Sequence, residues 1–226
     1  MPTHALDVLR RLDRSVPPAV ATRAEAGAGA APVIARASAS VVLLREVATG
    51  PAVALETYLL HRHARMPFAP SFVVFPGGGV DAVDVGEDPR LACALRETAE
   101  ETGVWLPAAA LRRWAHWVTP EVEPRRYDTV FYVAALPAGA EASDVSGETS
   151  HAEWRTPASA LAAAARGELA LMPPTASVLL ELAELPDLAA VAAAARDRVV
   201  EPVLPGLRRD GDGWSFVYPT PTGGAS

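Results

Sequence analysis

The stretch that decides the fold spans residues 96–104 and reads Arg-Glu-Thr-Ala-Glu-Glu-Thr-Gly-Val. Its three glutamates precede Gly103, a residue type that commonly follows the last turn of a helix. The carboxylates therefore fall in the last turns of a predicted helix, where the macrodipole disfavours each anion by about 0.3–1 kcal/mol. They also repel one another at helical spacing, and the single arginine cannot offset all three. We therefore expect a divalent, oxygen-seeking cation, Mg²⁺ or Mn²⁺, at Glu97, Glu100 and Glu101.

A glycine-rich segment precedes this helix. Residues 72–75 (Phe-Val-Val-Phe) predict a short strand, and residues 76–79 (Pro-Gly-Gly-Gly) favour an irregular loop whose backbone can approach a ligand or another strand closely. Asp88, followed by a proline, predicts the N-cap of the helix. A glycine loop joined by a short segment to a helix with three carboxylates suits a metal held over a phosphate. We expect one buried stripe on the helix, with the glutamates on the face beside it: Leu91, Leu95, Thr98 and Thr102.

From Gly78 to Val104 the chain resembles the signature of the Nudix hydrolases, in which a glycine and then a glutamate precede Arg-Glu-x-x-Glu-Glu-x-Gly. The second half of the signature matches from Arg96 onward. In the first half, counting forward from Gly78 reaches Asp84, whereas counting back from Arg96 reaches Asp88. The loop is therefore four residues longer (88 − 84) than the usual pattern, and an aspartate, or Glu87 out of register, replaces the usual first glutamate.

The resemblance implies a metal-dependent hydrolase that cleaves a nucleoside diphosphate linked to another group. Glu97, Glu100 and Glu101 would then ligate or order the metal, and Arg96 would orient a glutamate. The glycines Gly77, Gly78 and Gly79 would face the diphosphate. The general base stays open between Glu97 and a loop carboxylate, for which Glu148 is the first choice and Glu141 the second.

Other segments resemble the coenzyme A diphosphatase branch of the same family. Residues 117–120 (Trp-Val-Thr-Pro) and 125–129 (Arg-Arg-Tyr-Asp-Thr) are similar to segments of its acyl-CoA members. This likeness implies coenzyme A or an acyl-CoA as substrate; ADP-ribose, NADH or another nucleotide diphosphate is the alternative. The residues that match the branch pattern, with Gly79 as an additional glycine, are Phe75, Pro76, Gly77, Gly78, Asp81 and Asp84. The arginines expected to bind substrate phosphates are Arg62, Arg65, Arg125 and Arg126; for the last two, a solvated turn is the simpler alternative.

Two rival functions are disfavoured. Residues 77–82 mimic the glycine fingerprint of NAD-dependent oxidoreductases, but that motif needs a helix that begins at the glycines, and Pro89 delays the helix. A non-catalytic Nudix-fold nucleotide sensor is the second rival. Such a module is expected to lose at least one of the signature glutamates, and this chain keeps all three.

The composition and net charge of the chain limit the kinds of binding partner that we expect. The chain has 226 residues, is 50% hydrophobic and carries a formal charge of −7, which argues against a nucleic-acid polymer or an anionic membrane as partner. All 20 basic residues are arginine, so no lysine takes part in catalysis. Cys93 is the single cysteine, and we expect it to fill space in the core. The absence of a secretory pattern or a long apolar run predicts a cytoplasmic protein with a small-molecule partner. A homodimer is compatible with the sequence.

Apolar periodicity predicts a hairpin that joins residues 39–45 and 54–60, and a terminal hairpin around residues 210–213. The fold class is α/β, and the expected architecture, which the resemblance also implies, is a Nudix-like α/β/α sandwich with a mixed sheet, C-terminal helices and a terminal hairpin. Further strands are expected at 113–118, 129–136 and 152–155, and helices at 4–14, 157–166, 174–185 and 187–199. The expected divisions are an N-terminal helix and Ala/Gly/Pro-rich linker (1–37), the hydrolase domain (38–185) and a C-terminal extension (186–226).

The histidines and tryptophans of the chain are interpreted as exposed or packing residues rather than as ligands. His61 and His63 alternate on one strand face, but a hard-cation site favours oxygen, so we expect them to be exposed or packed. His116 and His151 show no partner pattern. The tryptophans at 105, 114 and 117 are expected in the core.

Overall fold

The computed structural model describes residues 8, 11–12, 14–26, 31–65, 71–147 and 149–219. The described helices are α2 (Pro18–Ala26), α3 (Pro89–Thr102), α4 (Pro157–Ala165), α5 (Pro173–Leu182) and α6 (Leu188–Arg196). The first seven strands are β1 (Arg36–Thr49), β2 (Ala52–Arg62), β3 (Phe72–Val74), β4 (Gly77–Gly79), β5 (Arg112–Val118), β6 (Tyr127–Ala135) and β7 (Thr149–Arg155). The remaining strands are β8 (Ala170–Leu171), β9 (Pro202–Val203), β10 (Gly206–Asp210) and β11 (Gly213–Val217).

A mixed sheet forms the centre of the molecule. Nine of the described strands belong to it, in the order β8-β3-β2-β1-β6-β5-β9, with β4 paired to β1 and β7 paired to β2. The long strand β1 is parallel to β6 and antiparallel to β2, to which it is joined by the predicted hairpin. The terminal hairpin of β10 and β11 forms a separate two-stranded sheet.

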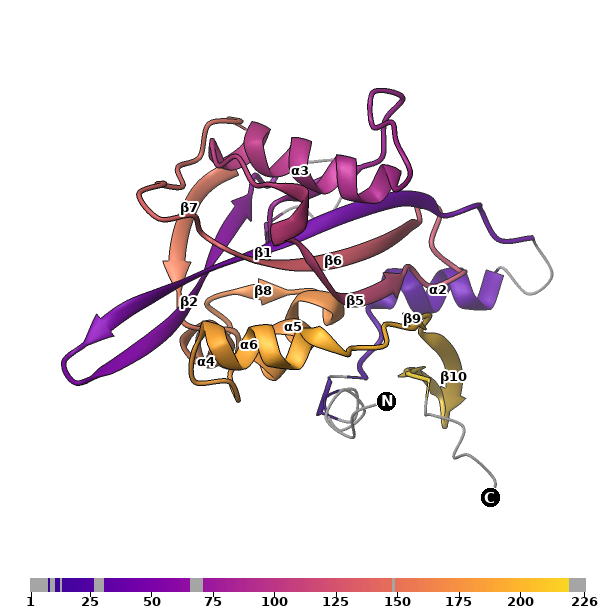
Figure 1. Ribbon diagram of the computed structural model, residues 1–226. Helices are drawn as coiled ribbons and strands as arrows, with labels where there is room; N and C mark the ends of the chain where they lie inside the picture. The colour runs from indigo at the N-terminus through magenta and orange to yellow at the C-terminus, as the bar shows by residue number, and fades with distance from the viewer. Residues whose placement is uncertain are drawn as a thin grey trace, which may run out of the picture.

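Helices cover both faces of this sheet (Figure 1), with α3 on one side and α4, α5 and α6 on the other. Strand β1 explains why both faces are buried, because successive side chains on a strand point in opposite directions. Val41 and Leu43 join the core under α3, whereas Val42 and Leu44 join the core under the C-terminal helices. All four are at most 1% exposed. The predicted α/β/α sandwich with a mixed sheet is confirmed.

The C-terminal part of the chain is anchored to this sheet. Arg198 forms an ion pair of 2.6 Å with Glu181 on α5, and both side chains are at least nine-tenths buried. Its guanidinium also lies 4.3 Å from the ring centre of Trp114 on β5 and donates to the Trp114 carbonyl. Strand β9 then pairs with β5. The divisions expected at residues 37/38 and 185/186 stay a prediction.

Some local expectations are wrong. Residues 18–26, expected in a linker, form the helix α2. Residues 77–79, expected in an irregular loop, form the strand β4. Trp105 is 83% exposed, although Trp114 and Trp117 lie in the core as expected. The helix expected at 4–14 falls mostly outside the described residues. Among the described residues, no helix is long and apolar enough to cross a membrane.

Candidate active site on the acidic helix

The helix α3 begins and ends where its local sequence predicts. The Asp88 side chain accepts hydrogen bonds from the backbone N–H groups of Arg90 and Leu91, at 3.1 and 3.3 Å, and therefore caps the N-terminus. Gly103 has φ +72° and closes the C-terminus by donating to the Ala99 carbonyl at 3.0 Å. These ends place all three glutamates in the last two turns. Cys93 is buried in this helix as expected, and burial raises the pKa of its thiol to about 12.

The glycine strand β4 lies between β1 and α3. Gly78 pairs with Ala39 of β1, and an added side-chain carbon at Gly78 would lie 2.2 Å from Oε1 of Glu97. Gly77 has φ +154°, and a side-chain carbon there would lie 2.3 Å from the Ala39 carbonyl oxygen. Glycine is therefore required at both positions by close approach, on one side to a carboxylate and on the other to a backbone. The predicted close approach to another strand is confirmed, and that strand is β1.

Arg96 is the centre of the carboxylate cluster. Its guanidinium forms a bidentate pair with Asp84, at 2.8 and 2.9 Å, and donates to Glu97 and Glu100 at 2.9 Å each. These partners raise its pKa well above the ordinary value, against the effect of burial. The contact with Asp84 also bears on the two ways of aligning the loop with the signature, of which one points to Asp84 and the other to Asp88. Asp84 takes the place next to the arginine, while Asp88 caps the helix.

The three glutamates have different surroundings. The Glu97 side chain is 17% exposed and that of Glu100 is 58% exposed. Glu101 is only 7% exposed and accepts a hydrogen bond of 2.7 Å from the Gly77 N–H. Glu101 was expected on the face beside the buried stripe; its side chain is buried, and its carboxylate ties α3 to β4. On the predicted stripe, Thr98 and Thr102 are fully buried, as expected, whereas the two leucines, Leu91 and Leu95, are only partly buried.

The donor set fits a hard divalent cation. Asp84, Glu97 and Glu100 share the single positive charge of Arg96, so the cluster keeps an excess of two negative charges. Burial, together with Glu100 and Asp84, raises the pKa of Glu97 above its ordinary value, although Arg96 acts in the other direction. A divalent cation would match the excess charge and relieve this repulsion. Metal binding by Glu97, Glu100 and Glu101 stays a prediction.

A loop approaches the C-terminal end of α3. The Ser143 N–H donates to the Thr102 carbonyl at 3.1 Å, and the Val145 N–H donates to the Glu101 carbonyl at 3.2 Å. This loop carries Glu141, which is exposed. Glu148, the first choice for a loop base, lies outside the described residues, so its role stays a prediction.

The predicted phosphate-binding arginines are dispersed. Arg62 is the last residue of β2, and Arg65 is exposed in the turn that follows. Arg126 is 8% exposed, and its guanidinium donates to the carbonyls of Val33 and Thr119, at 2.6 and 3.0 Å. Arg125 is exposed. These contacts give Arg126 a structural role, and phosphate binding by Arg125 stays a prediction.

Arg36 belongs to the site although the sequence did not suggest it. Its Nη2 atom would lie 3.3 Å from a side-chain carbon at Gly79, so the guanidinium lies over the glycine strand. Arg36 begins β1 at a position that the sequence assigned to a linker. The available signal was the apolar run from Val41 to Leu44, which extends backward into a strand that starts beside the glycines.

We expect Asp84→Asn to lower the free energy of unfolding by about 1–3 kcal/mol at pH 7, because a charged hydrogen-bond pair is lost. The hydrogen bonds from Arg96 lower the pKa of Asp84, and burial opposes them only in part. A carboxylate whose folded-state pKa is depressed stabilises the fold above its unfolded-state pKa of about 4. This contribution disappears as the pH falls through the lower folded-state pKa.

Urea unfolding of the wild type and the variant between pH 3 and pH 7, in EDTA, measures this difference. The two free energies should converge below about pH 4. Asp212→Asn, in the exposed hairpin turn, is the matched control and should show no such convergence. A difference that does not depend on pH would mean that the charge of Asp84 is not what stabilises the cluster.

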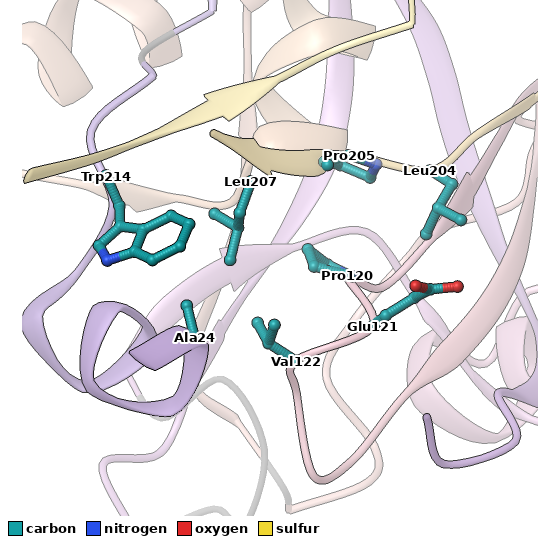
Figure 2. A pocket seen from close by; sticks show the side chains of 9 residues that line it. Ala24, Pro120, Glu121, Val122, Leu204, Pro205, Leu207 and Trp214 are labelled. Carbon is teal, nitrogen blue, oxygen red and sulfur yellow. The ribbon is translucent and has the colours of Figure 1, made fainter. Parts of the chain in front are cut away.

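A separate cavity of about 380 Å³ lies between α2, the turn at residues 120–122 and the terminal hairpin. Figure 2 shows Trp214 and Leu207 pointing from the hairpin toward Ala24 and Val122. Among the described residues that line it, only Glu121 is charged. An apolar cavity whose one charge is negative is poorly suited to a polyphosphate.

Comparison with known proteins gives the family. The NUDIX domain description matches residues 35–174. The chain is 28% identical to putative nudix hydrolase 7 of Caenorhabditis elegans over 166 residues, which is 57% of this chain and 56% of that protein. It is 39% identical to the acyl-coenzyme A diphosphatase NUDT19 of Xenopus laevis over 56 residues, which is 23% of this chain and 15% of that protein. The chain therefore spans little more than half of the first of these relatives and a small part of the second.

A solved structure agrees with the family match. The fold resembles the crystal structure of a NUDIX hydrolase from Alicyclobacillus acidocaldarius with a TM-score of 0.63 and 26% identity, covering 72% of this chain and 96% of that one. The residues that match the family description make up more than half of the chain and include β4, α3 and the whole carboxylate cluster around Arg96. This chain therefore belongs to the NUDIX domain family.

Proposed function

We propose that this protein is a divalent-metal-dependent hydrolase that cleaves the diphosphate of a nucleoside diphosphate linked to another group. The observation that carries the proposal is the cluster in which Asp84, Glu97 and Glu100 surround Arg96 beside the glycine strand, with two negative charges in excess. Membership in the NUDIX family supports it. A bound Mg²⁺ or Mn²⁺ would supply charge neutralisation at the phosphate oxygens and would favour ionisation of a water.

The residues of the chain have distinct roles in this proposal. Arg96 holds Glu97 and Glu100 in place, and Glu101 fixes the distance between α3 and β4. Water attacks one phosphorus, the bond from that phosphorus to the bridging oxygen breaks, and a carboxylate accepts the proton of the water. Glu97 fits the last role because its raised pKa lies closer to neutral pH than that of an ordinary carboxylate. Glu148, or else Glu141, is the alternative acceptor.

The test is a mass-spectrometric assay of the purified protein with ADP-ribose, NADH, coenzyme A and dephospho-coenzyme A. Each substrate is offered with Mg²⁺, with Mn²⁺ and with EDTA. We expect turnover of at least one substrate with metal and none with EDTA. Absence of turnover across the panel would leave the fold intact but would favour a nucleotide sensor. A cytoplasmic location and a homodimer stay predictions.

The substrate in this proposal is coenzyme A or an acyl-CoA, cleaved to 3′,5′-ADP and a 4′-phosphopantetheine product. The similarity to the Xenopus laevis acyl-coenzyme A diphosphatase supports it over a short segment. Strand pairing supports it too, because Ser38 of β1 pairs with Gly79 on one side and Thr129 on the other. The turn that bears Arg125 therefore lies at the same end of β1 as the glycine strand. In this proposal Arg36 contacts the diphosphate and Arg125 contacts the 3′-phosphate, since arginine is well suited to bidentate phosphate binding.

We expect dephospho-coenzyme A to be a poorer substrate than coenzyme A by about tenfold or more in kcat/KM, because a charged hydrogen bond to the 3′-phosphate is absent. Arg125→Ala should raise KM for coenzyme A and leave dephospho-coenzyme A unchanged. Arg196→Ala, an exposed arginine at the end of α6, is the matched control. Steady-state kinetics with both substrates measure the gap.

Equal kcat/KM for coenzyme A, dephospho-coenzyme A and ADP-ribose in the wild type would refute this substrate while leaving the diphosphate hydrolysis intact. Arg126 is left unchanged in this test because its guanidinium holds two backbone carbonyls. A loss of activity after its removal would report on folding as much as on phosphate binding.

A further inference from the structure

Two histidines and a glutamate meet on the opposite face of the sheet from α3. Strands β2 and β7 are antiparallel neighbours (Figure 1), and His61 pairs directly with His151. Glu153 lies two residues beyond His151 and therefore points to the same face. The residues adjacent to these on each strand, such as Leu60 and Ala152, belong to the core under α3. The three side chains are thus separated by the sheet from the carboxylate cluster.

The geometry brings three potential ligand atoms together. Nε2 of His61 lies 2.9 Å from Oε1 of Glu153, and the two imidazole ring centres are 5.1 Å apart. One ligand atom from each of the three residues lies within 4.8 Å of the other two. The side chains of His61 and Glu153 are only 22% and 21% exposed, whereas His151 is exposed. The side chains of His61 and Glu153 are therefore mostly covered by the protein, whereas the imidazole of His151 faces solvent.

The types of ligand atom in this group indicate which metal ion it would bind. Two imidazoles and one carboxylate are a donor set that Zn²⁺ commonly takes, with a fourth position left for water. A tetrahedral ion with metal–ligand distances of about 2.0–2.2 Å holds its ligand atoms roughly 3.4 Å apart. The 2.9 Å contact between His61 and Glu153 would therefore open slightly, and rotation of the exposed His151 can bring its ring nitrogen closer. Mg²⁺ prefers oxygen ligands and does not suit this set. Glu153 also forms an ion pair of 3.2 Å with Arg155 on the same strand.

We propose that His61, His151 and Glu153 bind a transition-metal ion, best fitted by Zn²⁺, at a site distinct from the carboxylate cluster. Such an ion cross-links β2 to β7 close to the start of β7. Thr149, the first residue of β7, bonds to Asp144 in the loop that packs against the end of α3. Metal binding at this edge therefore stabilises the strand pair and the base of that loop. The site does not depend on the proposed hydrolysis.

Isothermal titration with Zn²⁺ tests the site in the full chain, without nucleotide and with excess Mg²⁺ to occupy the carboxylate cluster. We expect one Zn²⁺ per chain and a rise in Tm. His151→Ala and Glu153→Gln should each weaken binding by about tenfold or more and abolish the rise in Tm. His63→Ala is the matched histidine control, and Glu100→Gln is the control for the acidic site; both should bind Zn²⁺ as the wild type does.

His151 is exposed, so its replacement should leave the metal-free Tm unchanged and keep the comparison valid. Co²⁺ provides an independent readout, because its visible absorption should report nitrogen ligands in the wild type and lose that signature in His151→Ala. Equal Zn²⁺ affinity in the wild type and His151→Ala, or no stoichiometric binding in the wild type, would overturn the proposal. Loss of Zn²⁺ binding in Glu100→Gln alone would assign the ion to the acidic helix.

Discussion

Glu97→Gln is expected to lower kcat by about 10²–10⁴-fold, the loss typical when a catalytic acid–base group is removed. The Glu97 side chain is partly buried. Its carboxylate accepts a hydrogen bond of 2.9 Å from the Arg96 guanidinium and packs against Gly78. Glutamine keeps its shape but removes the charge that would balance a cation and the oxygen that would accept a proton. Both versions of the mechanism therefore require the carboxylate, whether it holds the metal or acts as the base.

The fold should tolerate this change. Glu97 is a partly buried anion beside Asp84 and Glu100, and its raised pKa shows that the site disfavours its charge. The Tm of Glu97→Gln in EDTA should consequently equal or exceed that of the wild type. Glu87→Gln, an exposed glutamate in the preceding loop, is the matched control and should keep full activity. Near-wild-type turnover of Glu97→Gln in saturating Mg²⁺ would exclude the proposed site.

The sequence predicted well what depends on neighbouring residues in the chain. The ends of α3 follow from an aspartate–proline pair and a terminal glycine, and each acts within one turn of the helix. The hairpin of β1 and β2 likewise follows from apolar runs around a short turn. Local chemistry was therefore enough to place the glutamates in the last turns of one helix.

Features that depend on distant pairing were missed. Three glycines have little intrinsic preference for a strand, and β4 exists because β1 offers it hydrogen-bond partners. Glu101 is buried for the same reason, since the strand it contacts was not foreseen. The contact between His61 and His151 was missed because it rests on the pairing of β2 with β7, across 90 residues of sequence. From the sequence, His61 was considered only with His63, and His151 showed no partner.

The loop before α3 illustrates a third case. Its extra length left Asp84 and Asp88 as equal candidates for the first acid of the signature, and counting residues could not separate them. The structure separates them by their partners, since Asp84 meets the guanidinium of Arg96 and Asp88 meets backbone N–H groups. An aspartate can either cap a helix N-terminus or pair with an arginine. The sequence alone therefore could not assign the two roles to Asp84 and Asp88, and the contacts in the structure were needed.

Gly78→Ala should reduce activity about as much as Glu97→Gln, although it removes no functional group. The added methyl would lie 2.2 Å from Oε1 and 2.5 Å from Cδ of Glu97, so the carboxylate has to move. A displacement of about 1 Å at a catalytic group can cost about 10²-fold in rate. Because the atoms that must yield belong to the end of a flexible side chain, the loss of stability should be small. Gly213→Ala, in the terminal hairpin, is the matched control, since the nearest atom to its added carbon is the Asp210 carbonyl oxygen at 3.8 Å.

Kinetics of the single and double variants decide whether the methyl acts through Glu97. If it does, Gly78→Ala combined with Glu97→Gln should be no slower than the slower single variant, because both changes remove the same placed carboxylate. Multiplied losses in the double variant would instead mean that Gly78 contributes separately, through its own approach to the substrate. Full activity of Gly78→Ala alone would show that Glu97 functions from another position. The close packing of β4 against α3 would then not be needed for catalysis.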